Sequence, residues 1–125
     1  MKNKSFLQSL HHAYNGIKEL LKNERNMRIH IAMTVLVVTC SIVFGLTALE
    51  KAVVISLCAI VISAELINTA IENAVNLSTA VFNMYARRAK DAAAAAVLVV
   101  SIGAAVVGLI IFVPYGLLFL NLIFG

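Results

Sequence analysis

The sequence has few charged residues, and this shortage excludes an ordinary soluble domain. Only 13% of its 125 residues are Asp, Glu, Lys or Arg, whereas 62% are hydrophobic, and the mean hydropathy is +0.96. A soluble domain is usually about half apolar and a quarter charged. Because the hydrophobic residues gather in runs about as long as a bilayer is thick, the sequence predicts an integral membrane protein.

Cysteine and glycine are also scarce. The two cysteines, Cys40 and Cys58, both fall inside apolar segments. We interpret them as small lipid-facing or core-facing side chains and expect no disulfide, redox or metal role. The six glycines are scattered, and no G-x-x-x-x-G-K-[ST] loop is present. Since that loop cradles phosphates in soluble nucleotide-binding proteins, a fold of that kind is excluded.

The hydrophobic pattern predicts an all-α membrane protein with a single domain, residues 1–125. Apolar residues recur at helical spacing between about residues 5 and 22, with basic residues mostly opposite, which favours an amphipathic surface helix over a soluble capping helix. Three transmembrane helices are expected at about residues 29–46, 52–77 and 92–113. Pro114 should close the last one, and we interpret the short apolar tail, residues 115–125, as an interfacial or re-entrant end.

The positive charges predict the orientation in the membrane. Nine of the ten lysines and arginines lie before the first predicted span or between the second and the third, and only Lys51 lies elsewhere. The N-terminus and the second connection are therefore expected in the cytoplasm, with the C-terminus outside. Because these residues flank apolar spans, we attribute the net charge of +4 to orientation and not to nucleic-acid binding. His30 stands at the cytoplasmic entrance of the first span, where a lone histidine is more often an interfacial hydrogen-bonding residue than a ligand.

The second predicted span carries acidic and amide side chains. Its polar residues lie within about 80° of one another on a helix that turns about 100° per residue. An acidic residue near the centre of a membrane helix costs about 2.5–3.5 kcal/mol on insertion scales, so the carboxylates must face a protein interior, a cleft, a cation or each other. A buried polar seam between helices is the alternative, and it accounts for the amides better than for two glutamates. The four residues are Glu65, Asn68, Glu72 and Asn76.

In this orientation, acids and a lysine converge on the cytoplasmic face. Glu24 stands where the first predicted span enters the membrane, and Lys90 and Asp91 stand where the third enters. Carboxylates beside a lysine suit a magnesium–nucleotide site, because Mg²⁺ favours one or two carboxylates plus substrate phosphates. Glu65, about 10 Å deeper than Glu72, is placed to accept the proton of a lipid hydroxyl. A small ion carrier is an alternative from another class, although acids gathered toward one face do not line a path through the membrane.

Several segments resemble the small integral-membrane lipid kinases of prokaryotes, the diacylglycerol kinase and undecaprenol kinase family. Residues 65–72 read E-x-x-N-x-A-I-E, and residues 89–97 read A-K-D-x-x-x-A-A-V. Residues 24–30, which read E-R-N-x-x-x-H, and residues 110–114, which read I-I-F-x-P, resemble the Gram-positive undecaprenol kinase branch. The resemblance extends over nearly the whole chain.

The resemblance implies a homotrimeric bundle in the bacterial cell membrane, with active sites built between subunits at the cytoplasmic interface. It implies ATP-dependent phosphorylation of a lipid alcohol, with Mg²⁺ as cofactor. The expected substrate is undecaprenol, which would become undecaprenyl phosphate, and the alternative is diacylglycerol, which would become phosphatidic acid.

The resemblance also implies roles for individual residues. Glu65 would be the general base, Glu24 and Glu72 would hold the metal with ATP, and Asn68 would help to position the reacting groups. Lys90 and Asp91 would contact the nucleotide. Asn76 belongs to the same binding group, but it stands where the family usually has aspartate. Since the amide keeps hydrogen bonding and loses the charge, we expect weaker metal or nucleotide affinity. Because Asn76 replaces the usual aspartate, a further alternative is that the chain is an inactive, structural relative of these kinases.

Overall fold

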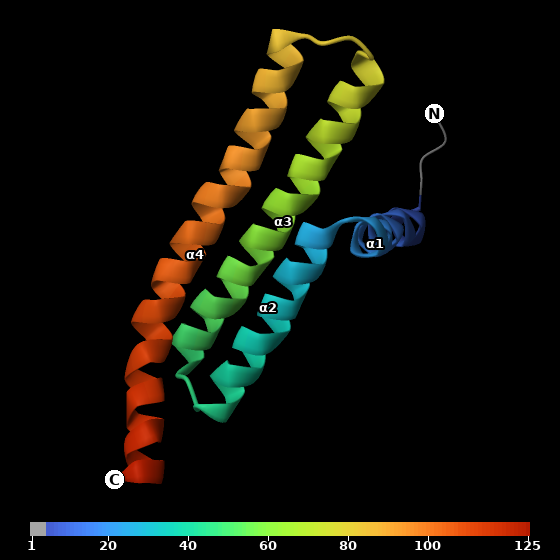
Figure 1. Cartoon of the computed structure of the whole chain (residues 1–125). Helices are drawn as coiled ribbons and strands as arrows, with labels where there is room; N and C mark the ends of the chain where they lie inside the picture. Colours follow the sequence, from blue (N-terminus) through green and yellow to red (C-terminus); the bar gives the residue numbers. More distant parts are fainter. Residues whose placement is uncertain (1–4) are drawn as a thin grey trace.

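The computed structural model describes residues 5–125, which form four helices and no strand. They are α1 (Phe6–Asn23), α2 (Arg25–Val43), α3 (Ala48–Ser78) and α4 (Met84–Phe124). Helix α3 is central, because it packs against α2 and α4, whereas α1 contacts α2 (Figure 1). Helices α2, α3 and α4 are each long and apolar enough to cross a membrane. The prediction of an all-α chain with three candidate membrane spans is therefore confirmed.

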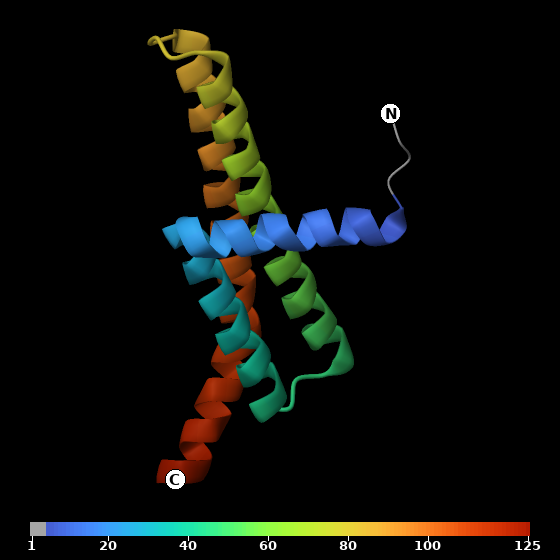
Figure 2. The same cartoon turned by 90° about the vertical axis from the view of Figure 1, so that its right-hand side faces the viewer.

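A single residue, Glu24, forms the corner between α1 and α2. Its backbone is extended, with φ −106° and ψ 119°, so it ends one helix and begins the next. Its N–H donates to the Leu20 carbonyl at 2.7 Å, but its carboxylate makes no capping hydrogen bond with α2. Helix α1 therefore leaves the bundle at a steep angle (Figure 2), and the Glu24 carboxylate remains available at the corner.

The tight turn at residues 44–47 makes α2 and α3 antiparallel neighbours, as the short gap between the first two predicted spans implies. Gly45 adopts a positive φ of 65°. This conformation lets its N–H reach the Ile42 carbonyl while the Leu46 N–H reaches the Ser41 carbonyl, each at 3.1 Å. A glycine in this position avoids the steric cost that a Cβ would meet. Helix α2 thus ends at Val43, and Gly45, two residues later, lets the chain reverse its direction.

Reciprocal capping starts α3 directly after this turn. The Thr47 hydroxyl accepts the Glu50 N–H at 3.2 Å, and the Glu50 carboxylate accepts the Thr47 N–H at 2.9 Å. Both bonds satisfy backbone donors that the first helical turn leaves free. The same Glu50 carboxylate accepts the Tyr115 hydroxyl at 2.6 Å, which ties α4 to this end of the bundle.

Helix α4 does not end at Pro114, so the prediction that this proline closes the last helix was wrong. The helix continues to Phe124, and residues 115–124 extend α4 without turning back (Figure 1). Proline removes one backbone donor, but membrane helices tolerate this loss when neighbouring groups hold the segment. Here Tyr115 binds Glu50, and Phe119 packs on Phe44 with ring centroids 5.7 Å apart.

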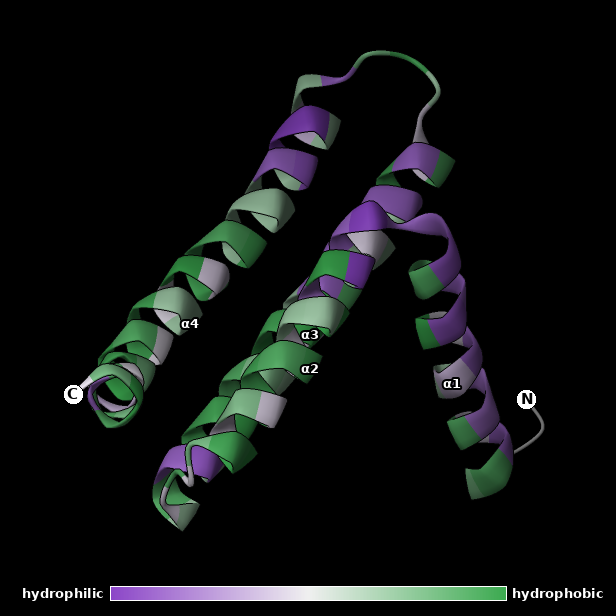
Figure 3. Cartoon of the chain, turned by 60° about the horizontal axis from the view of Figure 1, so that its bottom comes forward, coloured by the Kyte–Doolittle hydropathy of each residue, from purple (hydrophilic) through white to green (hydrophobic). Residues whose placement is uncertain are grey.

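The hairpin between α3 and α4 extends past the level of α1 in both views (Figures 1 and 2). Helix α3 ends at Ser78, and Asn83 caps α4 by accepting the N–H groups of Tyr85 and Ala86 at 2.9 and 3.2 Å. The connection expected over residues 78–91 is therefore mostly helical. Hydrophilic residues are concentrated at the end of α3 and the start of α4, whereas the rest of α2, α3 and α4 is largely hydrophobic (Figure 3).

The described chain has a very small core of its own. Most large apolar side chains of α2, α3 and α4 are exposed. Exposed apolar surface of this extent is typical of helices that contact lipid or other protein chains. Within residues 5–125, the buried hydrophobic residues are Met27, Leu46, Val54, Val61 and Ala93.

Candidate functional site

The most deeply buried acid, Glu65, lies in the middle of α3. Its side chain is turned toward α2, and only 2% of the residue is exposed. Its Oε2 atom is buried and has no hydrogen-bond partner within residues 5–125. Buried polar atoms are nearly always hydrogen-bonded, and an exception calls for an explanation such as a catalytic role or a missing ligand. Glu65 is therefore the natural centre of a candidate site.

His30 of α2 faces Glu65. Its Nε2 atom lies 3.7 Å from Glu65 Oε2, which is within ion-pair range but longer than a hydrogen bond. Its side chain is 18% exposed. The interpretation of His30 as an interfacial residue missed this contact. The signal was available in the numbering, since His30 lies 17 residues before Thr47 (47 − 30) and Glu65 lies 18 after it (65 − 47). A hairpin folded near Thr47 brings both to one level.

Two further carboxylates approach Glu65 from the outer side. Glu24 is half-buried at the α1–α2 corner, and Glu72 is exposed two helical turns beyond Glu65 on α3. Both are close enough for their charges to act on Glu65. Within residues 5–125, no group of three or more His, Cys, Asp or Glu side chains is placed to hold a metal ion. Two carboxylates without a full cage suit Mg²⁺, which completes its shell with water and substrate phosphates.

The remaining site candidates lie farther out along the hairpin. Lys90 donates from Nζ to Asn76 Oδ1 at 2.9 Å, which joins α4 to α3. Asp91 instead approaches Arg87 of its own helix, with Nε and Oδ2 3.6 Å apart, and both side chains are exposed. Asn76 lies three turns beyond Glu65, about 16 Å along the helix axis.

The structure thus divides the predicted residues into an inner and an outer set. Glu65, with Glu24 close by, forms the inner set, and Asn76 with Lys90 forms the outer set. Glu72 lies between them on α3, and Asn68 is half-buried one turn from Glu65. Asp91 is not brought against any other predicted residue within the described chain. Helix α3 contributes Glu65 to the inner set and Asn76 to the outer set, whereas Glu24 comes from the α1–α2 corner and Lys90 from α4.

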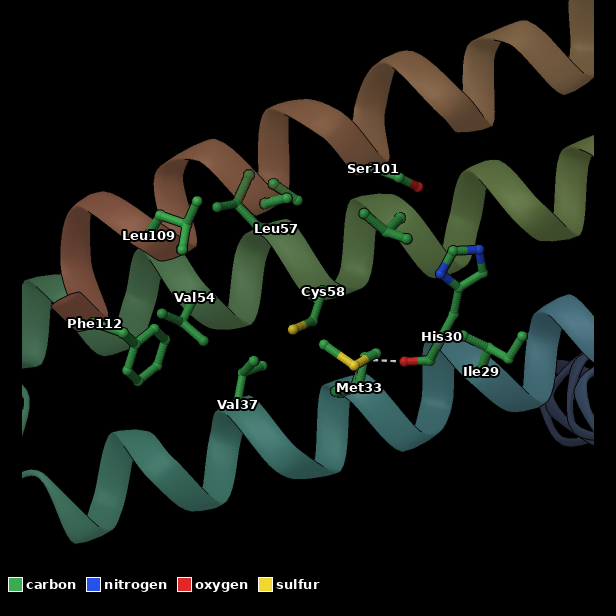
Figure 4. A pocket seen from close by; sticks show the side chains of 15 residues that line it. Ile29, His30, Met33, Val37, Val54, Leu57, Cys58, Ser101, Leu109 and Phe112 are labelled. Atoms are coloured by element: carbon green, nitrogen blue, oxygen red, sulfur yellow. Dashed lines mark hydrogen bonds between the residues drawn. The ribbon is translucent and has the colours of Figure 1, made fainter. Parts of the chain in front are cut away.

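An apolar cavity of about 520 Å³ opens behind His30, between α2, α3 and α4 (Figure 4). The imidazole stands at one end of the cavity, and Phe112 closes the other end. Cys58 and Ser101 both line the wall of the cavity. The Cys58 thiol is free, and the Ser101 Oγ atom is buried without a hydrogen-bond partner in the described residues. The His30–Glu65 contact therefore lies at the boundary between an apolar space and the polar end of the bundle.

Comparison with known proteins shows what the chain is similar to. The family described as "Prokaryotic diacylglycerol kinase" matches residues 11–112. The protein named undecaprenol kinase from Bacillus subtilis is 39% identical over 109 residues, which cover 87% of this chain and 89% of that protein. The protein named diacylglycerol kinase from Synechocystis sp. is 35% identical over 111 residues, which cover 88% of this chain and 63% of that protein.

Proposed function

The chain belongs to the prokaryotic diacylglycerol kinase family and is a membrane lipid kinase, and we propose that it phosphorylates undecaprenol with ATP to form undecaprenyl phosphate. The similarity to the Bacillus undecaprenol kinase supports this choice, because it is higher and covers more of the relative than the similarity to the Synechocystis diacylglycerol kinase. Diacylglycerol is the second candidate substrate, and the Synechocystis relative is the observation that favours it.

The single observation that carries the mechanism is the burial of the Glu65 carboxylate, whose Oε2 atom accepts no hydrogen bond from residues 5–125. In our proposal Glu65 is the general base. It accepts the proton when the O–H bond of the lipid alcohol breaks, and the freed oxygen forms a bond to the γ-phosphorus of ATP. The bond between that phosphorus and the bridging oxygen breaks, and its electron pair leaves with ADP.

Glu24 and Glu72 are the residues that would hold Mg²⁺ together with the ATP phosphates. The Glu24 carboxylate makes no capping bond with α2, and the Glu72 side chain is exposed, so both are accessible to an ion from outside the described residues. When bound, the ion would neutralise charge on the phosphates.

The outer residues are assigned to ATP. Lys90 is half-buried and already engages the Asn76 side chain, so its ammonium group is held at a defined place on the hairpin. In our proposal it contacts the phosphates, and Asp91 exchanges its exposed contact with Arg87 for the nucleotide. Asn68, one turn from Glu65, helps to position the reacting groups. Asn76 contributes an uncharged amide, so we expect the protein to bind the nucleotide more weakly than it would with a carboxylate at this position.

We further propose a homotrimer in the bacterial cell membrane, with α1 on the cytoplasmic surface. The small core and the exposed apolar faces of α2, α3 and α4 support an assembly. The steep angle of α1 and the distribution of basic residues support a cytoplasmic N-terminus and α3–α4 hairpin, with the C-terminus outside. Glu65 would then lie near the cytoplasmic surface, and ATP would approach along the projecting hairpin.

Membranes that contain the protein provide the test. We expect label transfer from ATP to added undecaprenol, faster than to added diacylglycerol, and a loss of about 100-fold or more in Glu65→Gln. Glu19→Gln is the matched control, because it neutralises an exposed acid on α1. Faster labelling of diacylglycerol would favour the second substrate, and full activity of Glu65→Gln would reject Glu65 as the base.

The same preparation separates the kinase from the ion carrier. A carrier predicts ion flux in vesicles without nucleotide, whereas the kinase requires ATP. The location of the carboxylates supports the kinase, because Glu24 stands where α2 begins, Glu65 faces His30 near that end of α2, and Glu72 lies two turns farther along α3. At the other end, Glu50 is held by hydrogen bonds to Thr47 and Tyr115.

A further inference from the structure

We propose that His30 is a positioning residue for Glu65, donating a hydrogen bond from Nε2 to Oε2 so that the other carboxylate oxygen faces the lipid hydroxyl. This inference rests on the proposed role of Glu65 as the base. Glu65 lies on α3, whereas His30 lies on α2. The two side chains meet because these helices pack against each other.

The geometry supports a donor at this place. The oxygen that lacks a hydrogen bond within residues 5–125, Glu65 Oε2, is the one 3.7 Å from His30 Nε2. A hydrogen bond requires about 2.7–3.2 Å, so a shift of less than about 1 Å forms it. Such contacts are often long in a protein without bound substrate and tighten when the substrate is bound. His30 can thus satisfy the buried oxygen after a small movement.

The hydrogen bonds of Thr34 and Arg28, two nearby residues of α2, do not involve the His30 ring. The Thr34 hydroxyl donates to the His30 carbonyl at 2.8 Å and so does not involve the ring. Arg28, the nearest cationic residue in the sequence of α2, donates to the Lys22 carbonyl toward α1. Within the part of the chain that the structure describes, His30 is the one basic side chain in ion-pair range of Glu65. Lys90 is instead engaged with Asn76.

The surroundings strengthen a single hydrogen bond. The imidazole lies on the wall of the apolar cavity, on the same helix as the lining residues Ile29 and Met33 (Figure 4). Away from water, a fixed donor restricts a carboxylate more effectively than it would at an exposed site. A general base works when its accepting oxygen is held in line with the proton that it removes. His30 neither gains nor loses a proton in the step. Its N–H remains on one oxygen of Glu65 while the other oxygen receives the proton of the alcohol.

The first experiment compares His30→Ala in two backgrounds. We expect kcat to fall about 10- to 100-fold in the otherwise unchanged protein, the range seen when a group that orients a functional side chain is removed, with the KM for ATP unchanged. In the Glu65→Gln background the same substitution should cause no further loss, because no base remains to be positioned. Unchanged kcat in the first background, or an equal loss in both, would overturn the proposal.

Two matched variants test the chemistry of the contact. His30→Gln keeps an N–H donor and should retain more activity than His30→Ala, so equal losses in both would contradict a hydrogen bond. Met33→Ala enlarges the same cavity and removes no hydrogen-bond donor, so its kcat should stay near that of the unchanged protein. A loss as large as that of His30→Ala would assign the effect to the cavity and not to the donor.

A second measurement does not depend on catalysis and separates this inference from the proposed function. The three histidines can be labelled with ¹⁵N in detergent-solubilised protein, and the His30 signals identified by their absence in His30→Gln. Glu65→Gln should shift the Nε2 resonance of His30, whereas Glu50→Gln should not. An unchanged resonance in Glu65→Gln would overturn the contact even if the kinase is active. A shift in a protein that phosphorylates neither lipid would instead reject only the proposed function.

Discussion

Two glutamates of the same helix, Glu50 and Glu65, lie in opposite chemical situations. The Oε2 atom of Glu50 accepts the N–H and hydroxyl of Thr47 at 2.9 and 3.0 Å and the hydroxyl of Tyr115 at 2.6 Å. The Oε2 atom of Glu65 is buried and accepts none from residues 5–125. A satisfied carboxylate holds helices together, whereas an unsatisfied buried one has been retained despite its cost. We infer that one end of the bundle is structural and the other is chemical.

Neutralising each glutamate gives the largest expected contrast. Glu65→Gln should lower kcat about 100-fold or more, while Glu50→Gln should keep kcat within about twofold, because the hydrogen bonds that it weakens, to Thr47 and Tyr115, lie far from the proposed reaction. Both variants should be extracted as folded helical protein, which circular dichroism in detergent verifies. Similar losses of kcat in the two variants would remove the distinction between the two ends.

The proposed role of Glu72 as a Mg²⁺ ligand gives a second test of the chemical end of the bundle. Glu72→Gln should raise the Mg²⁺ concentration needed for half-maximal activity and lower the rate at limiting Mg²⁺ about 10- to 100-fold, because one of two carboxylate ligands is lost. Titration of the phosphorylation rate with Mg²⁺ measures this, and Glu19→Gln serves as the control. An unchanged Mg²⁺ dependence would show that Glu72 is not a ligand.

Asn76 tests the outer part of the chemical end. Asn76→Asp adds a carboxylate opposite the Lys90 ammonium group, which already donates to this side chain at 2.9 Å. We expect the KM for ATP to fall by up to about tenfold, the effect of a charge-assisted contact. Steady-state rates at varied ATP provide the measurement. A higher KM would mean that the added charge repels the phosphates.

The smallest effect on catalysis is expected at the structural end. Tyr115→Phe removes the hydroxyl that binds Glu50 and leaves the ring in place. The unfolding temperature in detergent should fall slightly, and kcat should stay within about twofold. Thermal unfolding and the phosphorylation rate are measured on the same sample. A kinetic loss comparable to that of Glu65→Gln would show that this end contributes to the reaction.

Much of the fold is predictable from short stretches of sequence. The apolar runs predict three candidate spans, and the short gap between the first two, residues 47–51, predicts antiparallel neighbours, because hydrophobic length is a local property. The turn itself lies at residues 44–47, and residues 48–51 begin α3, because the Thr47 cap starts the helix earlier than the end of the charged stretch indicates. The outcome at Pro114 is different. Its local effect is to end a helix, but Tyr115 and Phe119 are held by residues of other segments, Glu50 and Phe44, and α4 continues.

The sequence by itself determined that this chain is a helical membrane protein with acids on one stripe of its second span, because helical spacing and hydropathy follow from residue order alone. Only the tertiary structure decided that Glu65 faces His30 and that Lys90 faces Asn76. The physical reason is that a rotation or a one-turn slide between packed helices changes every contact between them while leaving each helix unchanged.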